Sequence, residues 1–313
     1  MSFHSGFAAI LGPPNAGKST LLNALVGQKL AIISPKPQTT RNRILGIINV
    51  PQQKSRDGGQ VVLLDTPGVH LPDSSLGRKM MAEVGNAMEG CHLILFIVDV
   101  RRKWDAADGF ALELLKKSAT PAFLLLNKID LLPDKRSLLP LIAQFEQMHD
   151  FKEIIPISAL RKRGLDDLLQ SILQALPKGP RYFSGDQITD QPVRFMAAEI
   201  IREQILLSLR EEVPHAIAVI VDHFGEGEKL TRIAATIYCE RDGQKAIILG
   251  KRGQMLKRIG TAARLDIEKM IGTHVYLELY VKVQPGWRES RQFVEELDWR
   301  HQLEQIAGPS ERR

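Results

Sequence analysis

Phe7–Val26 reads FAAILGPPNAGKSTLLNALV, in which an apolar run leads into a glycine-containing loop and then into a helix-like stretch. The loop, Gly12–Ser19, fits the pattern G-x-x-x-x-G-K-S/T, and a strand before it with a helix after it is the context that this pattern requires. Backbone N–H groups of such a loop, together with the helix start, surround phosphate groups. The predicted phosphate contacts are Gly12, Asn15, Ala16, Gly17, Lys18, Ser19 and Thr20.

Short apolar runs recur through the first half of the chain, and a helical or loop segment follows each of them. They are Phe7–Leu11, Val61–Leu64, Leu93–Val98, Phe123–Leu126 and Ile154–Ile157. This alternation predicts an α/β fold, with a mostly parallel sheet covered by helices on both faces. Ile44–Val50 is expected to add an antiparallel edge strand, in a hairpin through residues 57–59.

A second motif, Asp65-Thr66-Pro67-Gly68, follows the run Val61–Leu64. An Asp–Gly turn after a strand is usually only a turn, but this one comes 47 residues after Lys18. At that distance Asp65 can hold Mg²⁺ through water, and the Gly68 N–H can contact a γ-phosphate. We therefore interpret the motif as a switch element that senses this phosphate.

A third motif, Asn127-Lys128-Ile129-Asp130, follows a strand at the edge where open α/β sheets bind ligands. The Asp130 carboxylate can accept from the N1–H and the exocyclic amine of guanine, whereas adenine would leave it unpaired. Lys128 is expected to lie along the base and to brace the phosphate loop. Ser158-Ala159-Leu160, past a further strand, supplies a backbone contact near the guanine oxygen. Together the motifs predict binding of GTP and GDP.

Magnesium is the expected metal of this site, with Ser19 and Asp65 as ligands. Pro37–Arg41 contains two threonines whose hydroxyl can complete the metal shell when a γ-phosphate is present. We favour Thr40, beside Arg41, over Thr39, which stays an alternative, as does a basic surface loop without a metal role. Lys18, which can reach the β- and γ-phosphate oxygens, and Thr40 are the expected catalytic residues.

Length and composition indicate a cytoplasmic protein of about two domains. The chain has 313 residues, 44% of them hydrophobic and 25% charged. Cys91 and Cys239 lie far apart in apolar stretches, which favours reduced core residues over a disulfide or metal site. The first residues lack the pattern of a secretory signal, and no apolar run has the length of a spanning helix. Peripheral association with the inner face of the cell membrane stays open, and we expect a monomer.

The net charge of +6 is unevenly distributed. No acid precedes Asp57, and Gly243–Leu265 is also free of acids while it carries six Lys or Arg residues. Two local positive fields indicate two polyanion sites, and an ordinary solvated basic face is the alternative.

The second half of the chain follows a different order. Breaker residues between Pro177 and Pro192 predict a linker over residues 178–192, between a domain of residues 1–177 and a domain of residues 193–313. A helix over 193–209, strands over 216–222 and 230–239, two helical stretches and a strand over 275–283 then give the order αββααβ. This order predicts a smaller α+β domain.

The strongest motif of this half is Gly250-Lys251-Arg252-Gly253, between the two helical stretches. Its glycines let a nucleic-acid backbone approach, and Lys251 and Arg252 meet phosphate, as in the loop of a type II KH domain, which clamps about four nucleotides of single-stranded RNA. Lys257 and Arg258 on the following helix are further expected RNA contacts. A helix–turn–helix glycine turn is the alternative. Trp287 either stacks on a base or packs against a helix expected over residues 289–305.

With these motifs in place, nearly the whole chain resembles the Era family of bacterial GTPases, including Gly179–Tyr182 and Thr189-Asp190 in the linker. The resemblance implies a GTP-hydrolysing factor that binds 16S ribosomal RNA near its 3′ end and assists small ribosomal subunit assembly and 16S rRNA maturation. It also implies a hydrophobic residue after Gly68, which Val69 satisfies.

Hydrolysis is expected to be slow, because the glutamine that orients water in Ras-type GTPases is missing after Gly68. His70 is a weak candidate for a base. Asn15 matches the asparagine that coordinates K⁺ in related GTPases, so K⁺ is a candidate cofactor. Alternatively, Asn15 only satisfies backbone groups of its loop.

Two other functions stay open at this stage. One is a constitutive RNA-binding protein with a hydrolytically idle nucleotide domain, although Lys18, Ser19, Asp65 and Asp130 are all intact. The other is a GTPase of transfer RNA modification, which would usually need a further catalytic or cofactor domain.

Overall fold

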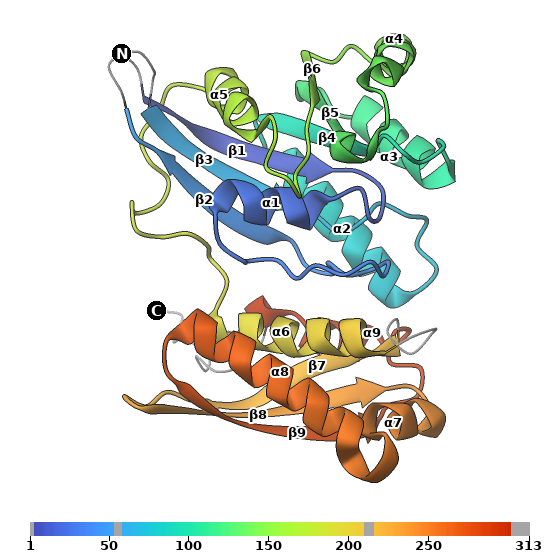
Figure 1. Ribbon diagram of the computed structural model, residues 1–313, viewed down its shortest axis with the longest axis vertical. Coiled ribbons are helices and arrows are strands. Elements are labelled where there is room, and N and C mark those ends of the chain that lie inside the picture. Colours follow the sequence, from blue (N-terminus) through green and yellow to red (C-terminus); the bar gives the residue numbers. More distant parts are fainter. Residues whose placement is uncertain (1–2, 53–57, 210–215, 302–313) are drawn as a thin grey trace, which may run out of the picture. The chain divides into compact units, whose positions relative to one another are not determined.

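The computed structural model describes residues 3–52, 58–209 and 216–301 and forms two compact units (Figure 1). The division falls between Asp190 and Gln191, and Asp73–Lys79 is assigned to the second unit. None of the helices described combines the length and the apolar character needed to span a bilayer.

The first unit alternates strands and helices along the chain. Its strands are β1 (Phe3–Leu11), β2 (Ile44–Val50), β3 (Gly58–Asp65), β4 (Leu93–Asp99), β5 (Ala122–Asn127) and β6 (Glu153–Pro156). Its helices are α1 (Lys18–Val26), most of α2 (Ser75–Glu89), α3 (Ala106–Lys116), α4 (Leu138–Met148) and α5 (Leu165–Ala175). Every expected strand is present within three residues of its predicted bounds, except that β1 begins four residues earlier.

The six strands form one sheet in the order β2-β3-β1-β4-β5-β6. β2 pairs antiparallel with β3, and every other pairing in this sheet is parallel. The expected mostly parallel sheet with an antiparallel edge strand is therefore confirmed. The turn predicted over residues 57–59 is placed too late in the chain, because Gly58 and Gly59 are already paired in β3. Residue 57 lies outside the described residues. Because the parallel strands share a direction, the segments after β1, β3, β4, β5 and β6 gather at one edge.

Helices cover both faces of this sheet (Figure 1). α1 and α5 pack on one face through their contacts with β1, β2 and β3. On the other face, side chains of α2, α3 and α4 share one buried cluster with β1, β4 and β5. Leu11, Phe96 and Leu124 belong to this cluster and are fully buried. Helices thus cover both faces of the sheet, and the loops at its carboxyl edge begin from buried strands.

Residues 182–190, within the predicted linker, lie along the β2 edge of the same sheet. Ile47 N donates to Ile188 O at 2.8 Å, and Thr189 Oγ1 donates to Leu45 O at 2.7 Å. The Gln60 side chain, which is fully buried, accepts from the N–H groups of Tyr182 and Phe183 at 2.8 and 2.9 Å. The predicted linker is therefore anchored to the first unit along most of its length.

The second unit has the order αββααβ. Its elements are α6 (Val193–Ser208), β7 (Ala218–Gly225), β8 (Leu230–Cys239), α7 (Asp242–Leu249), α8 (Gln254–Ile271), β9 (His274–Val283) and α9 (Arg291–Glu296). β8 pairs antiparallel with β7 and parallel with β9. α6 and α8 cover one face of this sheet (Figure 1). The predicted α+β domain is confirmed.

The last helix differs from the expectation of a continuous helix over residues 289–305. α9 begins after Ser290, whose hydroxyl accepts from Phe293 N at 3.3 Å, and it ends at Glu296. The Asp298 carboxylate accepts from Arg300 N at 3.0 Å, so it satisfies a backbone donor locally and starts a new helical turn. Residues 302–305 of the expected helix lie outside the described residues.

Candidate nucleotide and nucleic-acid sites

The phosphate loop joins β1 to α1, and its backbone requires glycine at two positions. Gly17 has φ 107°, and a Cβ there would lie 2.3 Å from Asn127 Nδ2. A Cβ on Gly12 would lie 2.4 Å from the carbonyl oxygen of Ile97. Asn15 also adopts a positive φ of 61°, which asparagine tolerates better than most residues. The loop therefore curves tightly before α1, whose first N–H groups face the pocket.

Lys18, the first residue of α1, is buried inside this loop. Its Nζ donates to the carbonyl oxygens of Gly12 and Pro13 at 3.0 and 2.7 Å. Burial lowers the pKa of Lys18 to about 8, although the nearby Asp65 carboxylate opposes this shift. The ammonium stays mainly charged near neutral pH, where it can meet phosphate oxygens.

Three oxygen-bearing side chains meet beside the loop. Ser19 Oγ donates to Asp65 Oδ2 at 2.7 Å and lies 2.8 Å from Thr40 Oγ1. Thr39 points elsewhere, since its hydroxyl donates to Lys36 O at 2.6 Å. The structure thus brings Thr40, and not Thr39, to Ser19 and Asp65.

This cluster suits a hard divalent cation. Burial raises the pKa of Asp65 to about 6, against the effects of its hydrogen bond from Ser19 and of the charge on Lys18. Its Oδ1 atom is buried and has no hydrogen-bond partner among the described residues. Hydroxyl and carboxylate oxygens are the donors that Mg²⁺ prefers. The residues present therefore fit magnesium.

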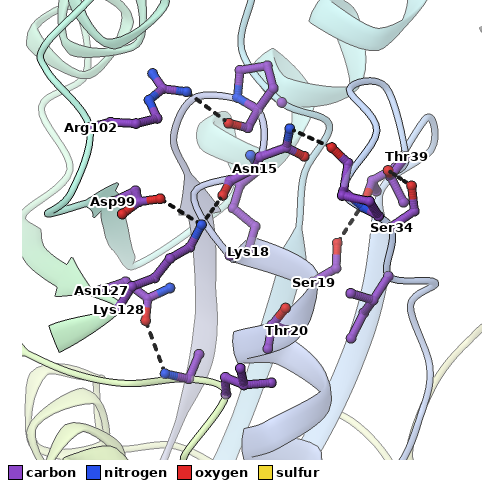
Figure 2. Close-up of a pocket in the computed structure, with 18 of the residues that line it drawn as sticks. Asn15, Lys18, Ser19, Thr20, Ser34, Thr39, Asp99, Arg102, Asn127 and Lys128 are labelled. Atoms are coloured by element: carbon purple, nitrogen blue, oxygen red, sulfur yellow. Dashed lines mark hydrogen bonds and ion pairs between the residues drawn. The ribbon is translucent and has the colours of Figure 1, made fainter. Parts of the chain in front are cut away.

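The predicted base-binding loops are tied to the phosphate loop (Figure 2). Asn127 Nδ2 donates to Ala16 O at 2.8 Å, and Asn127 Oδ1 accepts from Ala159 N at 3.0 Å. Lys128 Nζ donates to Asn15 O at 2.7 Å. The Asn127 side chain thus links the loop after β5 to the phosphate loop and to the Ser158–Leu160 loop, and Lys128 adds a second link to the phosphate loop.

The Asp130 carboxylate is fixed by Ser158, whose Oγ donates to Asp130 Oδ1 at 2.5 Å. Leu131 and Leu160 line the same pocket and are 50% and 71% exposed. The carboxylate and the two apolar side chains leave room for a flat, polar-edged ring.

Most of these groups line one pocket of about 530 Å³. Of the predicted nucleotide residues, the pocket brings together Asn15, Gly17, Lys18, Ser19, Thr20, Thr40, Gly68, Asn127, Lys128, Asp130, Ala159 and Leu160. Gly12, Ala16, Asp65 and Ser158 act behind its surface through the bonds given above. Sequence reasoning missed Ile32, Ile33, Asp99, Arg101, Arg102 and Leu131, which also line it. The position of Asp99 at the end of β4 was the one available signal.

Val69 and His70, which follow Gly68, have different surroundings. The Val69 side chain is fully buried in the core cluster, and its N–H donates to Gly12 O at 3.1 Å. His70 does not line the pocket, and its Nδ1 lies 2.9 Å from Leu71 O. Neither side chain is therefore placed to act on a ligand in the pocket.

The glycine loop of the second unit has the backbone that its sequence suggests. Gly250, Arg252 and Gly253 have φ values of 68°, 52° and 76°. A Cβ on Gly250 would lie 2.6 Å from Met255 Cβ, whereas a Cβ on Gly253 would meet nothing within 4 Å. The loop is thus packed at Gly250 and open at Gly253, where a partner can approach.

A groove of about 360 Å³ begins at this open glycine and continues along α8. Its lining residues are Gly253, Leu256, Lys257, Gly260, Thr261, Arg264, Leu277 and Leu279. Lys251, Arg252 and Arg258 are exposed beside it without lining it. Arg264 completes the basic side and could have been found from its spacing of seven residues after Lys257.

Trp287 is not an RNA-stacking residue. Its ring is fully buried, its Nε1 donates to Ala216 O at 3.0 Å, and it packs against Phe293 of α9 at 5.8 Å between ring centroids. The alternative that it packs against the last helix is therefore the correct one.

Comparison with known proteins decides the family. A family model described as 50S ribosome-binding GTPase matches residues 7–128, and a KH domain model matches residues 212–288. The chain is 47% identical over 301 residues to the GTPase Era of Ruminiclostridium cellulolyticum, covering 96% of this chain and 99% of that protein. This chain belongs to the Era family of GTPases. The GTPase Era of Geobacter metallireducens is 48% identical over 299 residues, or 95% of this chain and 98% of that protein.

Solved Era structures agree over the same length. One is a single-residue variant of Aquifex aeolicus Era bound to GDP.AlF4⁻, and another is Era in complex with MgGDPNP and nucleotides 1506–1542 of 16S ribosomal RNA. Each is 41% identical to this chain, has a TM-score of 0.88, and covers 94% of this chain and 98% of its own. This Era-family chain is therefore a GTPase with a P-loop domain and a KH domain.

Proposed function

We propose that this Era-family protein is a GTP-hydrolysing switch. In this proposal it binds single-stranded 16S ribosomal RNA through its KH domain and assists small ribosomal subunit assembly and 16S rRNA maturation. The observation that carries the proposal is the similarity to the Era complex with MgGDPNP and nucleotides 1506–1542, which extends over 94% of this chain. Both loops that such ligands require are formed here.

Guanine recognition falls to the loop after β5. Asp130, held by Ser158, accepts from the N1–H and the amine of the base, while Leu131 and Leu160 flank the ring. Adenine would leave the carboxylate oxygens facing an acceptor, and a site of this kind rejects the wrong partner strongly.

Phosphate and metal binding fall to the phosphate loop and its neighbours. Ser19, Thr40 and Asp65 would hold Mg²⁺, which when bound neutralises charge on the phosphate oxygens. The Lys18 ammonium donates to the β- and γ-phosphate oxygens, and the Gly68 N–H meets the γ-phosphate. Positioned charges of this kind contribute most when water is excluded, as around the buried Lys18.

Hydrolysis is slow in this proposal, because the position after Gly68 holds a valine in place of a glutamine that could orient water. Val69 is packed in the core, and its N–H serves the phosphate loop. Asn15 is the candidate ligand for K⁺, a cation that would add charge beside the transferred phosphate. Its Nδ2 donates to Pro35 O at 3.1 Å, and no hydrogen bond to its Oδ1 is made by the described part of the chain.

RNA binding uses the open side of the glycine loop and the groove along α8. The backbone of the RNA approaches at Gly253, and Lys251 and Arg252 contact its phosphates, with Lys257 and Arg258 as further contacts. Leu256 and Leu279 supply the apolar floor on which bases rest.

The two activities are coupled through the chain segment between the domains, which we assign to residues 178–192. The loops at Thr40 and Asp65–Gly68 have two conformations in this proposal. GTP can shift them toward one conformation only by binding that conformation more tightly than the other. Thr40 lies four residues before β2, and residues 182–190 are bonded along that strand. A change at Thr40 can therefore reach the residues that precede Gln191.

We further propose that the protein works as a monomer in the cytoplasm with peripheral contact to the inner face of the membrane. The net charge of +6 favours anionic lipid surfaces. Analytical ultracentrifugation and flotation with anionic vesicles test the two statements.

The decisive experiment measures affinity for a 3′-terminal 16S rRNA fragment at fixed salt, with GDP and with a non-hydrolysable GTP analogue. A severalfold difference that Gly253→Asp abolishes supports the switch. Tight binding that ignores the nucleotide instead supports a constitutive RNA binder. Because one matching family model is described as 50S ribosome-binding, a large-subunit RNA fragment is the matched control.

A further inference from the structure

Asp99 is the last residue of β4, and it lies between the phosphate loop and the base loop. In the sheet it is paired with Asn127, the first residue of the base motif. Its side chain is only 3% exposed. A buried carboxylate must be compensated by donors or cations, so its partners indicate what it does.

The carboxylate has two sets of partners. Asp99 Oδ1 accepts from Arg101 N at 3.0 Å, and the Arg101 guanidinium approaches both oxygens at 3.2 and 3.0 Å. Asp99 Oδ2 accepts from Lys128 Nζ at 2.7 Å. These bonds hold the pKa of Asp99 below its ordinary value although burial acts in the opposite direction. The carboxylate is therefore charged at neutral pH.

Lys128 is fixed at both ends by unusual restraints. Its backbone has φ 69°, in the left-handed region. Its ammonium joins Asp99 to the Asn15 carbonyl oxygen of the phosphate loop, at 2.7 Å on each side (Figure 2). A free lysine side chain would sample many rotamers, and this pair of bonds selects one.

We propose that Asp99 is a positioning residue for nucleotide binding, which holds the Lys128 ammonium against the phosphate loop and so locks the base loop to that loop. The inference rests on the proposed nucleotide site. The guanine ring and the phosphates are bound by different loops. A fixed distance between these two loops increases the affinity for a ligand whose base and phosphates lie at that distance. Without the carboxylate the ammonium loses its charged partner, and the two loops move independently.

A simpler role is the alternative, in which Asp99 only closes the turn at Arg101. The two roles differ in their dependence on Lys128. If Asp99 acts through Lys128, its removal has no further effect once Lys128 is gone. If it only closes the turn, the two losses add, because mutations without a shared interaction are additive.

The test is a double-mutant cycle on GDP affinity in the full chain, with Asp99→Asn, Lys128→Met and the double variant. We expect Asp99→Asn to weaken GDP binding roughly tenfold, as for loss of a charge-assisted bond. The double variant should bind as weakly as Lys128→Met alone. Inosine diphosphate (IDP) lacks the exocyclic amine of guanine, which is assigned to Asp130. The ratio of GDP affinity to IDP affinity should therefore be the same in Asp99→Asn as in the unmodified protein.

Glu113→Gln is the matched control, since its ion pair with Lys116 is exposed on α3 and outside the pocket. Circular dichroism melting shows whether each variant is folded. If Asp99→Asn does not fold, Asp99→Glu, which keeps the carboxylate, is measured in its place and should bind GDP more tightly than a variant without the carboxylate. Additive losses, or unchanged affinity in Asp99→Asn, overturn the inference. Failure of the unmodified protein to bind GDP would instead overturn the proposed function on which it rests.

Discussion

At the scale of single residues, two buried charges govern the nucleotide site. The pKa of Lys18 is lowered to about 8 and that of Asp65 is raised to about 6, in both cases chiefly by burial. Each charged form is therefore less stable here than in water, and each is stabilised when a ligand of opposite charge arrives. In the proposed site these ligands are phosphate for Lys18 and Mg²⁺ for Asp65.

The raised pKa of Asp65 predicts how magnesium binding depends on pH. A carboxyl with a pKa of about 6 is mainly protonated below that pH, and Mg²⁺ must displace the proton. The magnesium affinity of the GDP complex should therefore fall up to about tenfold per pH unit below ~6 and level off above ~7. Mg²⁺ titration of a fluorescent GDP analogue measures it, and Asp65→Asn is the control for titration of GDP itself. The prediction would be contradicted if the magnesium affinity of the unmodified protein varied with pH no more than that of Asp65→Asn.

Asn15 carries the prediction on potassium. Hydrolysis of GTP should be severalfold faster in K⁺ than in Na⁺ at equal ionic strength, and Asn15→Ala should remove the difference while GDP affinity changes less. Phosphate release under single-turnover conditions is the measurement. Equal rates in the two buffers would contradict the potassium role and would leave the Asn15 side chain with its bond to Pro35 O.

At the scale of elements, the edge strand β2 is covered by residues 182–190. An uncovered edge strand is a hazard for aggregation, and this segment satisfies part of its backbone. Gln60 of β3 holds the segment through three hydrogen bonds, two accepted from the N–H groups of Tyr182 and Phe183 and one donated to Phe183 O. A fourth bond is donated to Asn49 of β2. The segment is thus part of the first unit, although its composition resembles a linker.

Gln60→Ala should lower the free energy of unfolding by roughly 1–3 kcal/mol, because the fully buried Gln60 side chain loses its hydrogen bonds and the N–H groups of Tyr182 and Phe183 lose their acceptor. Urea denaturation followed by circular dichroism measures the change. Gln147→Ala, at an exposed position of α4, is the matched control and should stay within about 0.5 kcal/mol. Equal effects of the two changes would show that the segment is not held by Gln60.

The glycine loop before α8 carries a prediction on RNA. Gly253 has φ 76°, and a Cβ there would meet no atom within 4 Å, so Gly253→Asp places a carboxylate on the open side and strains the loop. RNA affinity should fall at least about tenfold while GDP affinity is unchanged. Filter binding at several salt concentrations measures the loss. Unchanged RNA affinity would remove the loop from the proposed interface.

At the scale of the whole molecule, the two sites must obey thermodynamic linkage. If RNA binds one nucleotide state more tightly by some factor, RNA must raise the affinity for that nucleotide by the same factor. We therefore expect the ratio of GDP to GTP-analogue affinity to shift on addition of the 16S fragment by the factor found in the RNA titration. Calorimetric titrations in both orders check it, and unequal factors would show that a further equilibrium takes part.

Much of this protein followed from its sequence, because its signals are local. The spacing of Gly12, Gly17 and Lys18 fixes a loop whose backbone admits no other residues at the glycines. The order of apolar runs and helical stretches along the chain predicted both folds. The motifs that follow the strands could also be assigned to one site from the sequence, since parallel strands bring their carboxyl ends together.

Other features depended on contacts between residues far apart in the chain, which no local pattern encodes. Thr40 and Thr39 are adjacent in sequence, and only the path of their segment brings Thr40 to Ser19. Asp99 resembles any strand end until Lys128 is placed 2.7 Å from it. Residues 182–190 read as a linker because their order comes from Gln60 and β2 and not from their own composition. Local propensity and spacing determined the elements and motifs, and tertiary packing decided which side chains meet.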